Sequence, residues 1–354
     1  MLREKHTSGY ISFLKLKLPE YKHVFAIRDK GFNDSMYYKL SIPNNSNVHI
    51  VDTYNDVFSD PLLAKICSKA KKIVFSGIWT AAPFMEELMK HPALLRKTWL
   101  QFWGGDYICF QTGVPKVEES DREILTNAFR HCAGLVFLTN GEYERFSEIT
   151  GVENRHMIAP VPKDPRRKIP SISEVPHSHE IPRILVGNSA NHSSHHTRIL
   201  ELLHSAYPND IFDVICPLSY GGGPNYISEI ISLGQKYFGE HFIPLLKYME
   251  PDEYDSMLAN CDVGIFDFER QQGLGNINTL LLAGKKVYLN QTSPLWKSLS
   301  ERGCILFSIN EIGTIPFRDF ASMQESDRQT NRIANDPVKF DAQKRAQWKA
   351  LLEA

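Results

Sequence analysis

The chain has 354 residues, with 40 Lys and Arg against 41 Asp and Glu, and 42% of its residues are hydrophobic. These ordinary globular values exclude a collagen-like, disordered or coiled-coil chain, and the length predicts two domains that each bury a core. The formal net charge of −1 argues against a dedicated nucleic-acid-binding protein, which carries a basic excess, so no nucleic acid is expected as a partner.

Short apolar runs alternate with longer amphipathic stretches in the first half of the chain. This alternation is typical of a parallel sheet with helices on both faces. The predicted strands are residues 23–27, 47–51, 72–76, 98–102, 134–138 and 156–159. The predicted helices include residues 60–70, 83–90, 121–131 and 143–149.

A proline-rich segment interrupts this alternation at residues 160–182, which hold six of the 20 prolines. Because each proline lacks a backbone N–H and fixes φ, we expect no regular structure there. We interpret residues 161–182 as a linker that follows an N-terminal domain of residues 1–160.

The alternation restarts after the linker. The predicted strands are residues 183–186, 212–216, 242–248, 263–267 and 286–290, and the predicted helices are 192–205, 224–238, 251–260 and 276–283. We expect a C-terminal domain at residues 183–325 and a helical tail at 326–354 that packs back on the N-terminal domain. The fold class is therefore predicted as α/β, with two doubly wound, Rossmann-like domains. In such sheets ligands bind beyond the carboxyl ends of the strands.

The cysteines and the hydropathy pattern indicate the cellular compartment of the protein. None of the six cysteines forms a CxxC pair, which favours reduced thiols over a disulfide framework or a zinc site. No stretch approaches 18 consecutive apolar residues, and Met1–Lys5 lacks the apolar segment of a signal peptide. We expect a cytoplasmic chain that can still rest on a membrane.

The strongest local signal is Phe268–Asn278, which follows a predicted strand and opens a predicted helix. Gly273 and Gly275 allow a ligand to approach the backbone, and the helix start offers unpaired N–H groups that suit a phosphate. The segment is neither a GxGxxG fingerprint nor a Walker sequence, so it indicates a nucleotide diphosphate without specifying NAD or ATP. A glycine-rich turn with a helix cap is the alternative.

A second loop of the same kind is Gly187–His192, which also leads from a strand to a helix. Gly187 suits the tight turn, and Asn188 and Ser189 can donate hydrogen bonds to phosphate or sugar oxygens. The alternative interpretation is a cluster of helix-capping residues.

The third loop, Leu218–Tyr226, contains three consecutive glycines after a strand. Tyr220 and Tyr226 can stack on a sugar or base, or bind a phosphate. A loop that only connects two elements is the alternative.

Three histidines, His192, His195 and His196, lie on one face of a predicted helix. A metal site needs further ligands, and none has an obvious spacing, so we expect polar histidines and no bound metal.

In the first domain, Gln101–Asp106 ends a predicted strand and contains two glycines. Asp106 lies close to Trp103, and a carboxylate beside an aromatic wall suits general-base chemistry or the binding of sugar hydroxyls. Trp79, which ends the preceding strand segment, is expected on the same rim. A turn or cap aspartate is the alternative role for Asp106.

Basic residues are concentrated in the first domain. Residues 1–22 hold five Lys and Arg against two Glu, and residues 63–99 hold seven against two. A basic surface can rest on an anionic leaflet, where each charge contributes roughly 1 kcal/mol. A solvated charged face is the alternative.

Together these motifs resemble the 4-acetamido-4,6-dideoxygalactose transferases of enterobacterial common antigen and related surface polysaccharides, glycosyltransferase family 56. The matching pieces are Trp103–Asp106, Ile184–Ser189, Ser219–Tyr226, Arg270–Gly275, Leu280–Gly284 and Pro294–Trp296. The chain departs from the family pattern at Met1–Tyr10, which lacks the usual opening strand, and from residue 308 onward.

The resemblance implies the GT-B fold, in which two Rossmann-like domains face each other across a cleft. It implies transfer of an N-acetylated amino-dideoxyhexose from a dTDP-sugar to an undecaprenyl-diphosphate-linked saccharide, at the inner face of the cytoplasmic membrane. The partners would be the nucleotide sugar, the lipid-linked acceptor and the anionic membrane surface. Such enzymes hold the donor in the second domain and need neither a cofactor nor a bound metal for the diphosphate.

This interpretation assigns a role to each candidate residue. Asp106 would act on the acceptor hydroxyl as base or orienting group, with Trp79 and Trp103 on the acceptor side. The residues expected to bind the donor are Gly187, Asn188, Ser189, Tyr220, Tyr248, Glu269, Gln271, Gln272, Gly273, Leu274, Gly275 and Asn276. Among these, residues 273–276 would bind the diphosphate, Gln271 or Gln272 would lie near the donor sugar, and Tyr248 would face the base.

Other functions remain open from the sequence. One is a GT-B transferase that uses a UDP- or GDP-sugar, and another is a sugar-nucleotide epimerase. A non-catalytic protein that binds polysaccharide or a protein partner is a third, although glycines and amides at three strand ends disfavour it.

Overall fold

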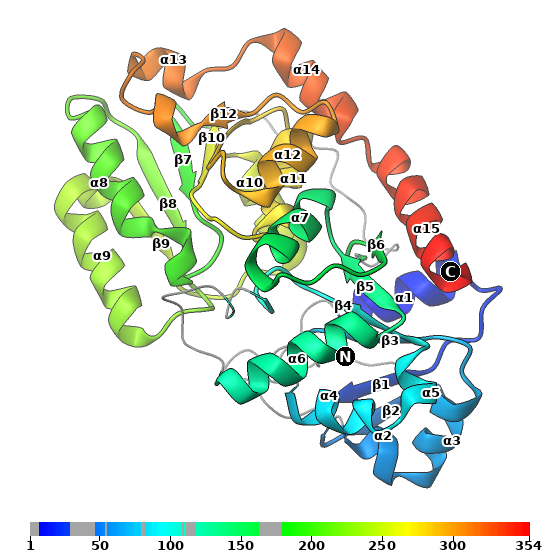
Figure 1. The fold of residues 1–354 in the computed structure, drawn as a ribbon. Coiled ribbons are helices and arrows are strands. Elements are labelled where there is room, and N and C mark those ends of the chain that lie inside the picture. The colour runs from blue at the N-terminus through cyan, green and yellow to red at the C-terminus, as the bar shows by residue number, and fades with distance from the viewer. Residues whose placement is uncertain are drawn as a thin grey trace. The chain divides into compact units, whose positions relative to one another are not determined.

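The computed structural model describes residues 7–28, 47–53, 55–78, 82–107, 110, 118–162 and 179–354. The chain forms two compact units: unit 1 contains residues 1–168 and 341–354, and unit 2 contains residues 169–340. Both are α/β domains built on parallel strands (Figure 1). Most of the predicted linker lies outside the described residues.

Unit 1 has two parallel sheets among its described residues. β1 (Phe25–Arg28) pairs with β2 (Val48–Val51), and a second sheet has the order β3-β4-β5-β6. These four strands are Ile73–Ser76, Thr98–Gln101, Gly134–Phe137 and His156–Ile158. The helices between the strands are α2 (Asp56–Ser59), α3 (Pro61–Lys69), α4 (Ala82–Met89), α5 (Pro92–Leu95), α6 (Glu119–His131) and α7 (Asn140–Thr150).

Helices from both ends of the chain pack together on unit 1. The described residues begin with α1 (Thr7–Lys17), so the segment in which no strand was predicted leads into a helix. The last helix, α15 (Pro337–Glu353), places Trp348 in the same apolar cluster as Tyr10 and Trp99. The rings of Tyr10 and Trp348 meet edge to face at 5.1 Å, and the Trp348 Nε1–H donates to the Pro160 carbonyl at 3.0 Å.

Unit 2 is a single parallel sheet with the strand order β12-β11-β10-β7-β8-β9. The strands are β7 (Arg183–Val186), β8 (Asp213–Pro217), β9 (Phe242–Leu245), β10 (Val263–Phe266), β11 (Lys286–Leu289) and β12 (Phe307–Ser308). The chain runs outward from β7 to β9 and then returns to β10 on the other side of β7. The switch point of the topology, where ligands bind in such sheets, therefore lies between β7 and β10.

The helices of unit 2 begin and end at residues with clear physical roles. Pro224 and Pro251 occupy first-turn positions that need no N–H donor, and Gly273 precedes α11 with a φ of +64°. The helices are α8 (His196–Ala206), α9 (Pro224–Phe238), α10 (Pro251–Ala259), α11 (Leu274–Leu282), α12 (Pro294–Glu301), α13 (Phe317–Ala321) and α14 (Glu325–Ala334). The predicted strand 183–186 and the predicted helix 224–238 match β7 and α9.

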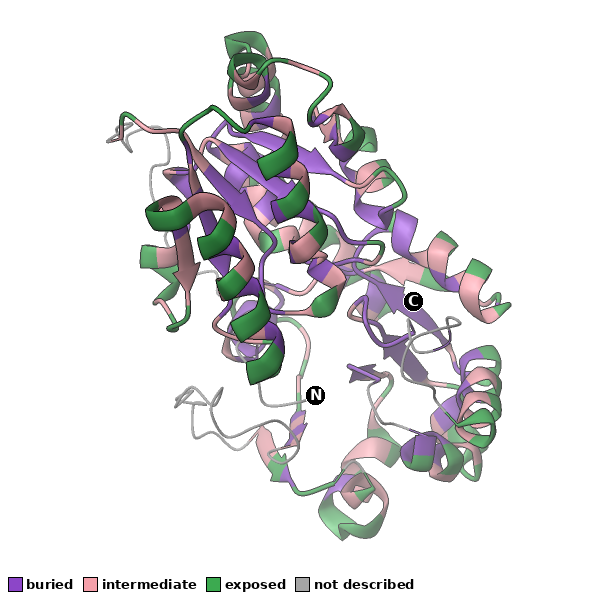
Figure 2. Cartoon of the chain, turned by 90° about the vertical axis from the view of Figure 1, so that its left-hand side faces the viewer, coloured by how far each residue is buried: buried purple, intermediate pink, exposed green. Residues whose placement is uncertain are grey.

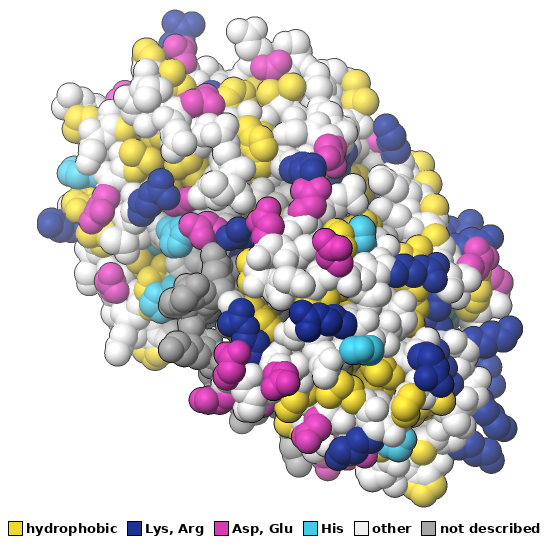
Figure 3. Space-filling model, in the orientation of Figure 1, with side chains coloured by type: hydrophobic (Ala, Val, Ile, Leu, Met, Phe, Trp, Pro, Cys, Tyr) yellow, Lys and Arg dark blue, Asp and Glu magenta, His cyan; other side chains and the backbone are white. Residues whose placement is uncertain are grey.

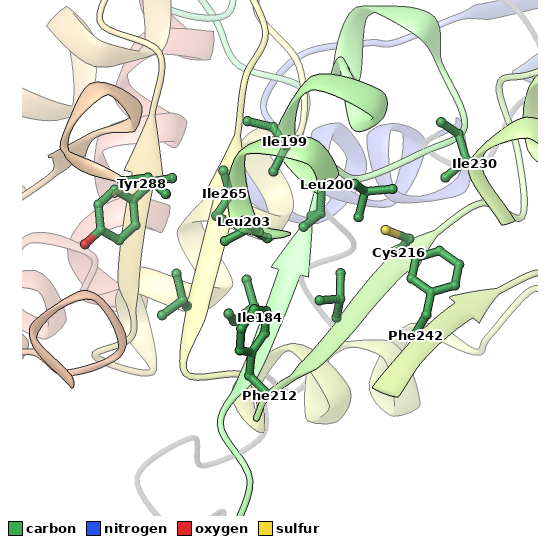
Figure 4. Packing of buried hydrophobic residues seen from close by; sticks show 14 of the residues in the cluster. Ile184, Ile199, Leu200, Leu203, Phe212, Cys216, Ile230, Phe242, Ile265 and Tyr288 are labelled. Atoms are coloured by element: carbon green, nitrogen blue, oxygen red, sulfur yellow. The ribbon is translucent and has the colours of Figure 1, made fainter. Parts of the chain in front are cut away.

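Buried strands form the centre of each unit, and the exposed residues concentrate on the helices (Figure 2). In unit 2 one apolar cluster lies between the sheet and the helices α8 and α9, with Ile184, Leu200 and Ile230 at 0% exposure (Figure 4). A second cluster lies around α11 and α12 and includes Leu280 and Leu295. These two layers hold the strand ends of the sheet in fixed positions. In the described ranges, no helix is long and apolar enough to cross a membrane.

The packing of α15 on unit 1 predicts a large effect of truncating Trp348. We expect Trp348→Ala to lower the free energy of unfolding by about 3–5 kcal/mol, because the Trp348 side chain is 1% exposed and its removal leaves a cavity in the core. Urea unfolding followed by circular dichroism measures the change. Gln343→Ala, at an exposed position of the same helix, serves as control and should stay within about 0.5 kcal/mol of the wild type. Equal effects of the two substitutions would contradict the role of α15 in the core.

Candidate active site

Three loops follow neighbouring strands at the carboxyl edge of the unit 2 sheet. Residues 187–195 follow β7, residues 218–223 follow β8 and residues 267–273 follow β10. β7 pairs with both β8 and β10 in parallel register, so the three loops begin side by side. These are the three loops that the sequence singles out separately.

Side-chain hydrogen bonds join these loops into one network. The Gln272 amide donates to Asn188 Oδ1 at 2.8 Å and to Ser194 Oγ at 3.1 Å, and Gln272 Oε1 accepts from Ser193 Oγ at 2.7 Å. Asn188 Nδ2 donates to the Tyr220 hydroxyl at 3.2 Å. The network therefore satisfies the hydrogen-bonding groups of the Gln272 side chain and orients the side chains of Asn188 and Tyr220.

Two of the predicted glycines serve the packing of the protein itself. Gly187 has a φ of +70°, and a Cβ there would lie 2.7 Å from His196 Nε2. Gly273 has a φ of +64°, and a Cβ there would lie 3.3 Å from the Asn188 side chain. Gly275 differs, because a Cβ there would meet nothing within 4 Å. Of the three, only Gly275 leaves open space in front of the backbone.

The N-terminus of α11 lies beside this network. Its first helical hydrogen bond runs from the Ile277 N–H to the Gly273 carbonyl, so the N–H groups of residues 274–276 have no partner within the helix. These donors and the helix dipole favour an anion. The side chain of Asn276 instead donates to the Tyr254 hydroxyl at 2.8 Å, which leaves its backbone for a ligand.

The other predicted donor-side residues lie around this centre. Gln271 is 6% exposed, and Ser189 is 4% exposed with its carbonyl accepting from Ser194 Oγ. Leu274 packs against the apolar cluster of α11 and α12. Glu269 is exposed in the loop after β10, and Tyr248 is 47% exposed after the edge strand β9.

A buried carboxylate at the end of β10 escaped the sequence analysis. The Asp267 side chain is 0% exposed and accepts hydrogen bonds from Arg198 Nη1 at 2.7 Å and from Asn290 Nδ2 at 2.9 Å. His195 Nδ1 lies 3.6 Å from the same carboxylate, an ion-pair distance. Burial alone raises the pKa of Asp267, but its neighbours together hold that pKa below its ordinary value. Asp267 thus ties together the segments that follow β7, β10 and β11.

The three histidines take different roles. His195 is the one non-glycine residue with a positive φ, +48°, in the described ranges, and the nearby Asp267 carboxylate raises its pKa. His196 is buried, its Nδ1 lies 3.0 Å from the Tyr226 hydroxyl, and burial lowers its pKa to about 4. His192 lies against the Tyr226 ring. Tyr226 is therefore held in place by two histidines, and its contact with a ligand stays a prediction.

An open hollow of about 370 Å³ adjoins these histidines and is lined by His192, His195, Thr197, Arg198, Tyr226 and Glu229. Among the residues that the structure describes, no cluster of three or more His, Cys, Asp and Glu side chains has a geometry suited to a metal ion. The five cysteines described are free thiols.

In unit 1, Asp106 joins two strand-end loops. Its Oδ2 accepts from the Ile78 N–H at 2.7 Å and its Oδ1 accepts from the Trp103 N–H at 3.0 Å, with the residue 4% exposed. Trp103 Nε1 donates to Ser76 Oγ at 2.9 Å. Asp106 thus has the loop-organising contacts of the alternative role, and its catalytic role stays a prediction. Trp79 lies outside the described residues.

Solved structures with low sequence identity share this fold. The sucrose-phosphate synthase of Thermosynechococcus elongatus aligns with a TM-score of 0.63 at 12% identity, covering 97% of this chain and 90% of that chain. HepE of Anabaena, in complex with UDP and glucose, aligns with 0.59 at 12% identity over 99% and 93%. A glycosyltransferase of Rickettsia africae ESF-5 aligns with 0.58 at 13% identity over 98% and 93%. At these identities the similarity shows the fold alone.

The fold is thus the GT-B fold, and the matched family identifies the protein as a glycosyltransferase. The family model described as "4-alpha-L-fucosyltransferase glycosyl transferase group 56" matches residues 124–354, more than half of the chain. The chain therefore belongs to glycosyltransferase family 56. This membership decides against the epimerase and the non-catalytic binding protein.

The pairing of His195 with Asp267 predicts a pH dependence of stability. Because the pKa of His195 is raised above its ordinary value of 6.5, the protonated ring stabilises the fold fully below pH 6.5, and the stabilisation is lost as the pH rises through the raised pKa. We expect His195→Asn to flatten this part of the profile, since Asn tolerates a positive φ but does not titrate.

Urea unfolding at several pH values between 6 and about 9 measures this difference. The comparison uses the slope of stability against pH, so a constant loss of stability in the variant does not affect it. His204→Asn, a histidine on α8 away from Asp267, is the matched control and should keep the wild-type slope. Identical slopes for the wild type and His195→Asn would contradict the assignment.

Proposed function

We propose that the protein transfers an N-acetylated amino-dideoxyhexose from a dTDP-sugar to an undecaprenyl-diphosphate-linked saccharide. Membership of family 56 supports sugar transfer. The single observation that carries the nucleotide-sugar part is the N-terminus of α11 at the switch point of unit 2, with open space in front of Gly275.

In this proposal the backbone N–H groups of residues 274–276 bind the diphosphate. The leaving group takes the electron pair of the broken sugar–phosphate bond, and oriented N–H donors with the helix dipole stabilise its charge without a metal ion. Gly187, Asn188 and Ser189 line the opposite side of the switch point, and Gln271 lies near the donor sugar. Gln272 holds the loops in position, Tyr220 is oriented by Asn188, and Tyr248 and Glu269 face the base and the sugar hydroxyls.

On the acceptor side, we propose that Asp106 and Trp103 organise the loops after β3 and β4 around the acceptor hydroxyl. The acceptor is lipid-linked, so the protein works as a peripheral protein at the inner face of the cytoplasmic membrane. The Asp106 carboxylate either takes the proton of the acceptor hydroxyl or fixes the loops that orient this hydroxyl.

Nucleotide binding tests the donor. We expect dTDP to stabilise the protein by about 2.7 kcal/mol at 100 times its dissociation constant, and UDP or GDP to stabilise it less at equal concentration. The shift should persist in EDTA. A larger shift with UDP or GDP would support a transferase with another donor, and no shift with any of the three would overturn the assignment of the α11 site.

A charge at Gly275 tests where the diphosphate binds. We expect Gly275→Asp to weaken dTDP binding about ten-fold or more by like-charge repulsion, while an acid in the first turn of the helix leaves folding intact. Gly275→Asn has nearly the same size without the charge and is the matched control. Isothermal titration calorimetry measures both affinities, and equal weakening by the two variants would show that size, and not charge, is sensed.

Asp106 is tested through transfer. Because an amide can accept only one of the two N–H groups that the carboxylate accepts, we expect Asp106→Asn to lower the transfer rate by at least about 100-fold. The affinity of the variant for dTDP, which binds in unit 2, should be unchanged. An unchanged rate of transfer would refute a role of Asp106 in the reaction.

A further inference from the structure

His195 and Asp267 form a pair at the carboxyl edge of the unit 2 sheet that the proposed function does not use. The Nδ1 atom of His195 is buried and lies 3.6 Å from Oδ2 of Asp267, whose side chain is 0% exposed. The His195 side chain as a whole is 38% exposed and lines the hollow of about 370 Å³. Because Nδ1 is buried, the exposed part of the side chain is the opposite edge of the ring, which carries Nε2.

Asp267 is held in place independently of His195. Its carboxylate accepts hydrogen bonds from Arg198 Nη1 at 2.7 Å and from Asn290 Nδ2 at 2.9 Å. A carboxylate fixed in this way orients the imidazole ring beside it and stabilises the imidazolium ion that forms when the ring takes up a proton. A carboxylate at one ring nitrogen, with the other nitrogen open, is the arrangement in which histidine acts as a general base.

The backbone at His195 also indicates a function for its side chain. Its φ of +48° falls at the junction where a short 3-10 helix (His192–Ser194) ends and α8 begins. Glycine and asparagine adopt this conformation at a lower cost than histidine does. Non-glycine residues in such conformations concentrate at active sites, where the strained backbone positions a side chain.

The pair lies in the loops that border the proposed diphosphate site. Ser194, the residue before His195, accepts at its Oγ a hydrogen bond of 3.1 Å from the Gln272 amide. Gln272 directly precedes Gly273, the residue that opens α11. Asp267 begins the same loop, because it follows the last residue of β10. The pair therefore occupies the α8 side of the region in which the donor would bind.

We propose that His195 is the base that takes the proton of the acceptor hydroxyl, and that Asp267 is the residue that positions it. The acceptor oxygen bonds to the anomeric carbon of the donor sugar while the bond from that carbon to the phosphate oxygen breaks. The electron pair of the broken bond leaves with the nucleoside diphosphate, and the hydroxyl proton passes to Nε2 of His195. The inference rests on the proposed function, since it requires the donor at α11. It leaves Asp106 the role of fixing the acceptor loops.

Two other titratable groups fit the role of base less well. Both oxygens of Asp106 accept hydrogen bonds from backbone N–H groups, and the residue is 4% exposed. His196 is 0% exposed, and burial lowers its pKa to about 4, which makes it a weak base. His195 combines an open ring nitrogen with a carboxylate behind the ring.

The charges around His195 set the pH range in which it can act. Asp267 and, more weakly, Glu269 raise its pKa above 6.5, against the effect of burial. The other charged or titratable groups close to the ring or the hollow are Arg198 on α8, Glu229 on α9, His192 and His196. In Figure 3, histidine, acidic and basic side chains lie together on unit 2 where Figure 1 labels β8 and β9. Because a base acts in its neutral form, transfer should speed up as the pH rises through the raised pKa.

Replacement by glycine tests the base, because glycine adopts a φ of +48° without strain and leaves space for a free imidazole. We expect His195→Gly to lower the rate of transfer by about 100-fold or more. Added imidazole should restore part of the rate, and triazole, a weaker base of similar shape, should restore less. The affinity of the variant for dTDP should stay close to that of the wild type, which checks that the variant is folded.

The matched control is His204→Asn, which changes a histidine of α8 outside the lining of the hollow. It should keep the wild-type rate. An unchanged rate in His195→Gly, a loss that imidazole does not reverse, or equal rescue by imidazole and triazole would overturn the proposal.

The pH profile of transfer tests the role of Asp267. Asp267→Asn removes the charge that raises the pKa of His195, so the rise of the rate with pH should move to lower pH. A carboxylate that only supports the fold would change the rate without moving this rise. A rise at the wild-type pH would therefore contradict the positioning role.

The donor is tested separately in the same assays. They use whichever of the dTDP-, UDP- and GDP-sugars the wild type consumes. Consumption of a UDP- or GDP-sugar alone would contradict the proposed donor. Loss of that activity in His195→Gly and its rescue by imidazole would still support His195 as the base.

Discussion

Gln272 and Asn188 lie 84 residues apart, and the 2.8 Å hydrogen bond between their side chains depends on β7 and β10 being neighbours in the sheet. The two strands are neighbours because the chain, after β9, returns to the other side of β7 and forms β10 there. The loops 187–195 and 267–273 therefore begin at the same edge of the sheet, and their side chains form hydrogen bonds with each other. The donor site, the bends at Gly187 and Gly273 and the position of α11 all follow from that crossover.

Asp267 shows how the crossover is stabilised and at what cost. Burying a carboxylate is unfavourable unless it is paired and hydrogen-bonded. Here Arg198 and His195 from the segment after β7 and Asn290 from the segment after β11 surround it, so a movement of either segment would cost the carboxylate some of its partners. The positive φ of His195 fits the same explanation, since surrounding contacts must maintain a strained backbone. A site built in this way is rigid before the substrate arrives, which suits electrostatic stabilisation of a leaving group.

Elements that depend on local periodicity could be predicted from the sequence. Contacts between residues that are distant in the chain could not. β7 and α9 follow from an apolar run and from a proline-started amphipathic stretch. α1 was missed because Tyr10, Ile11, Phe13 and Leu14 are all buried, which leaves no polar face to reveal a helical period. The three loops were recognised by their glycines and amides, but their hydrogen bonds were not. In the sequence, Asp267 is only the last residue of a predicted strand, because its contacts with Arg198 and Asn290 form only when the chain is folded.

Parallel α/β architecture also separates opposite charges along each unit. Every helix that returns the chain begins near the carboxyl edge of the sheet and ends near the amino edge, so N–H donors face one edge and carbonyl groups the other. In unit 2 this rule places the anion-binding start of α11 beside the switch point. In unit 1 it places Lys72 and Lys97 against helix C-termini.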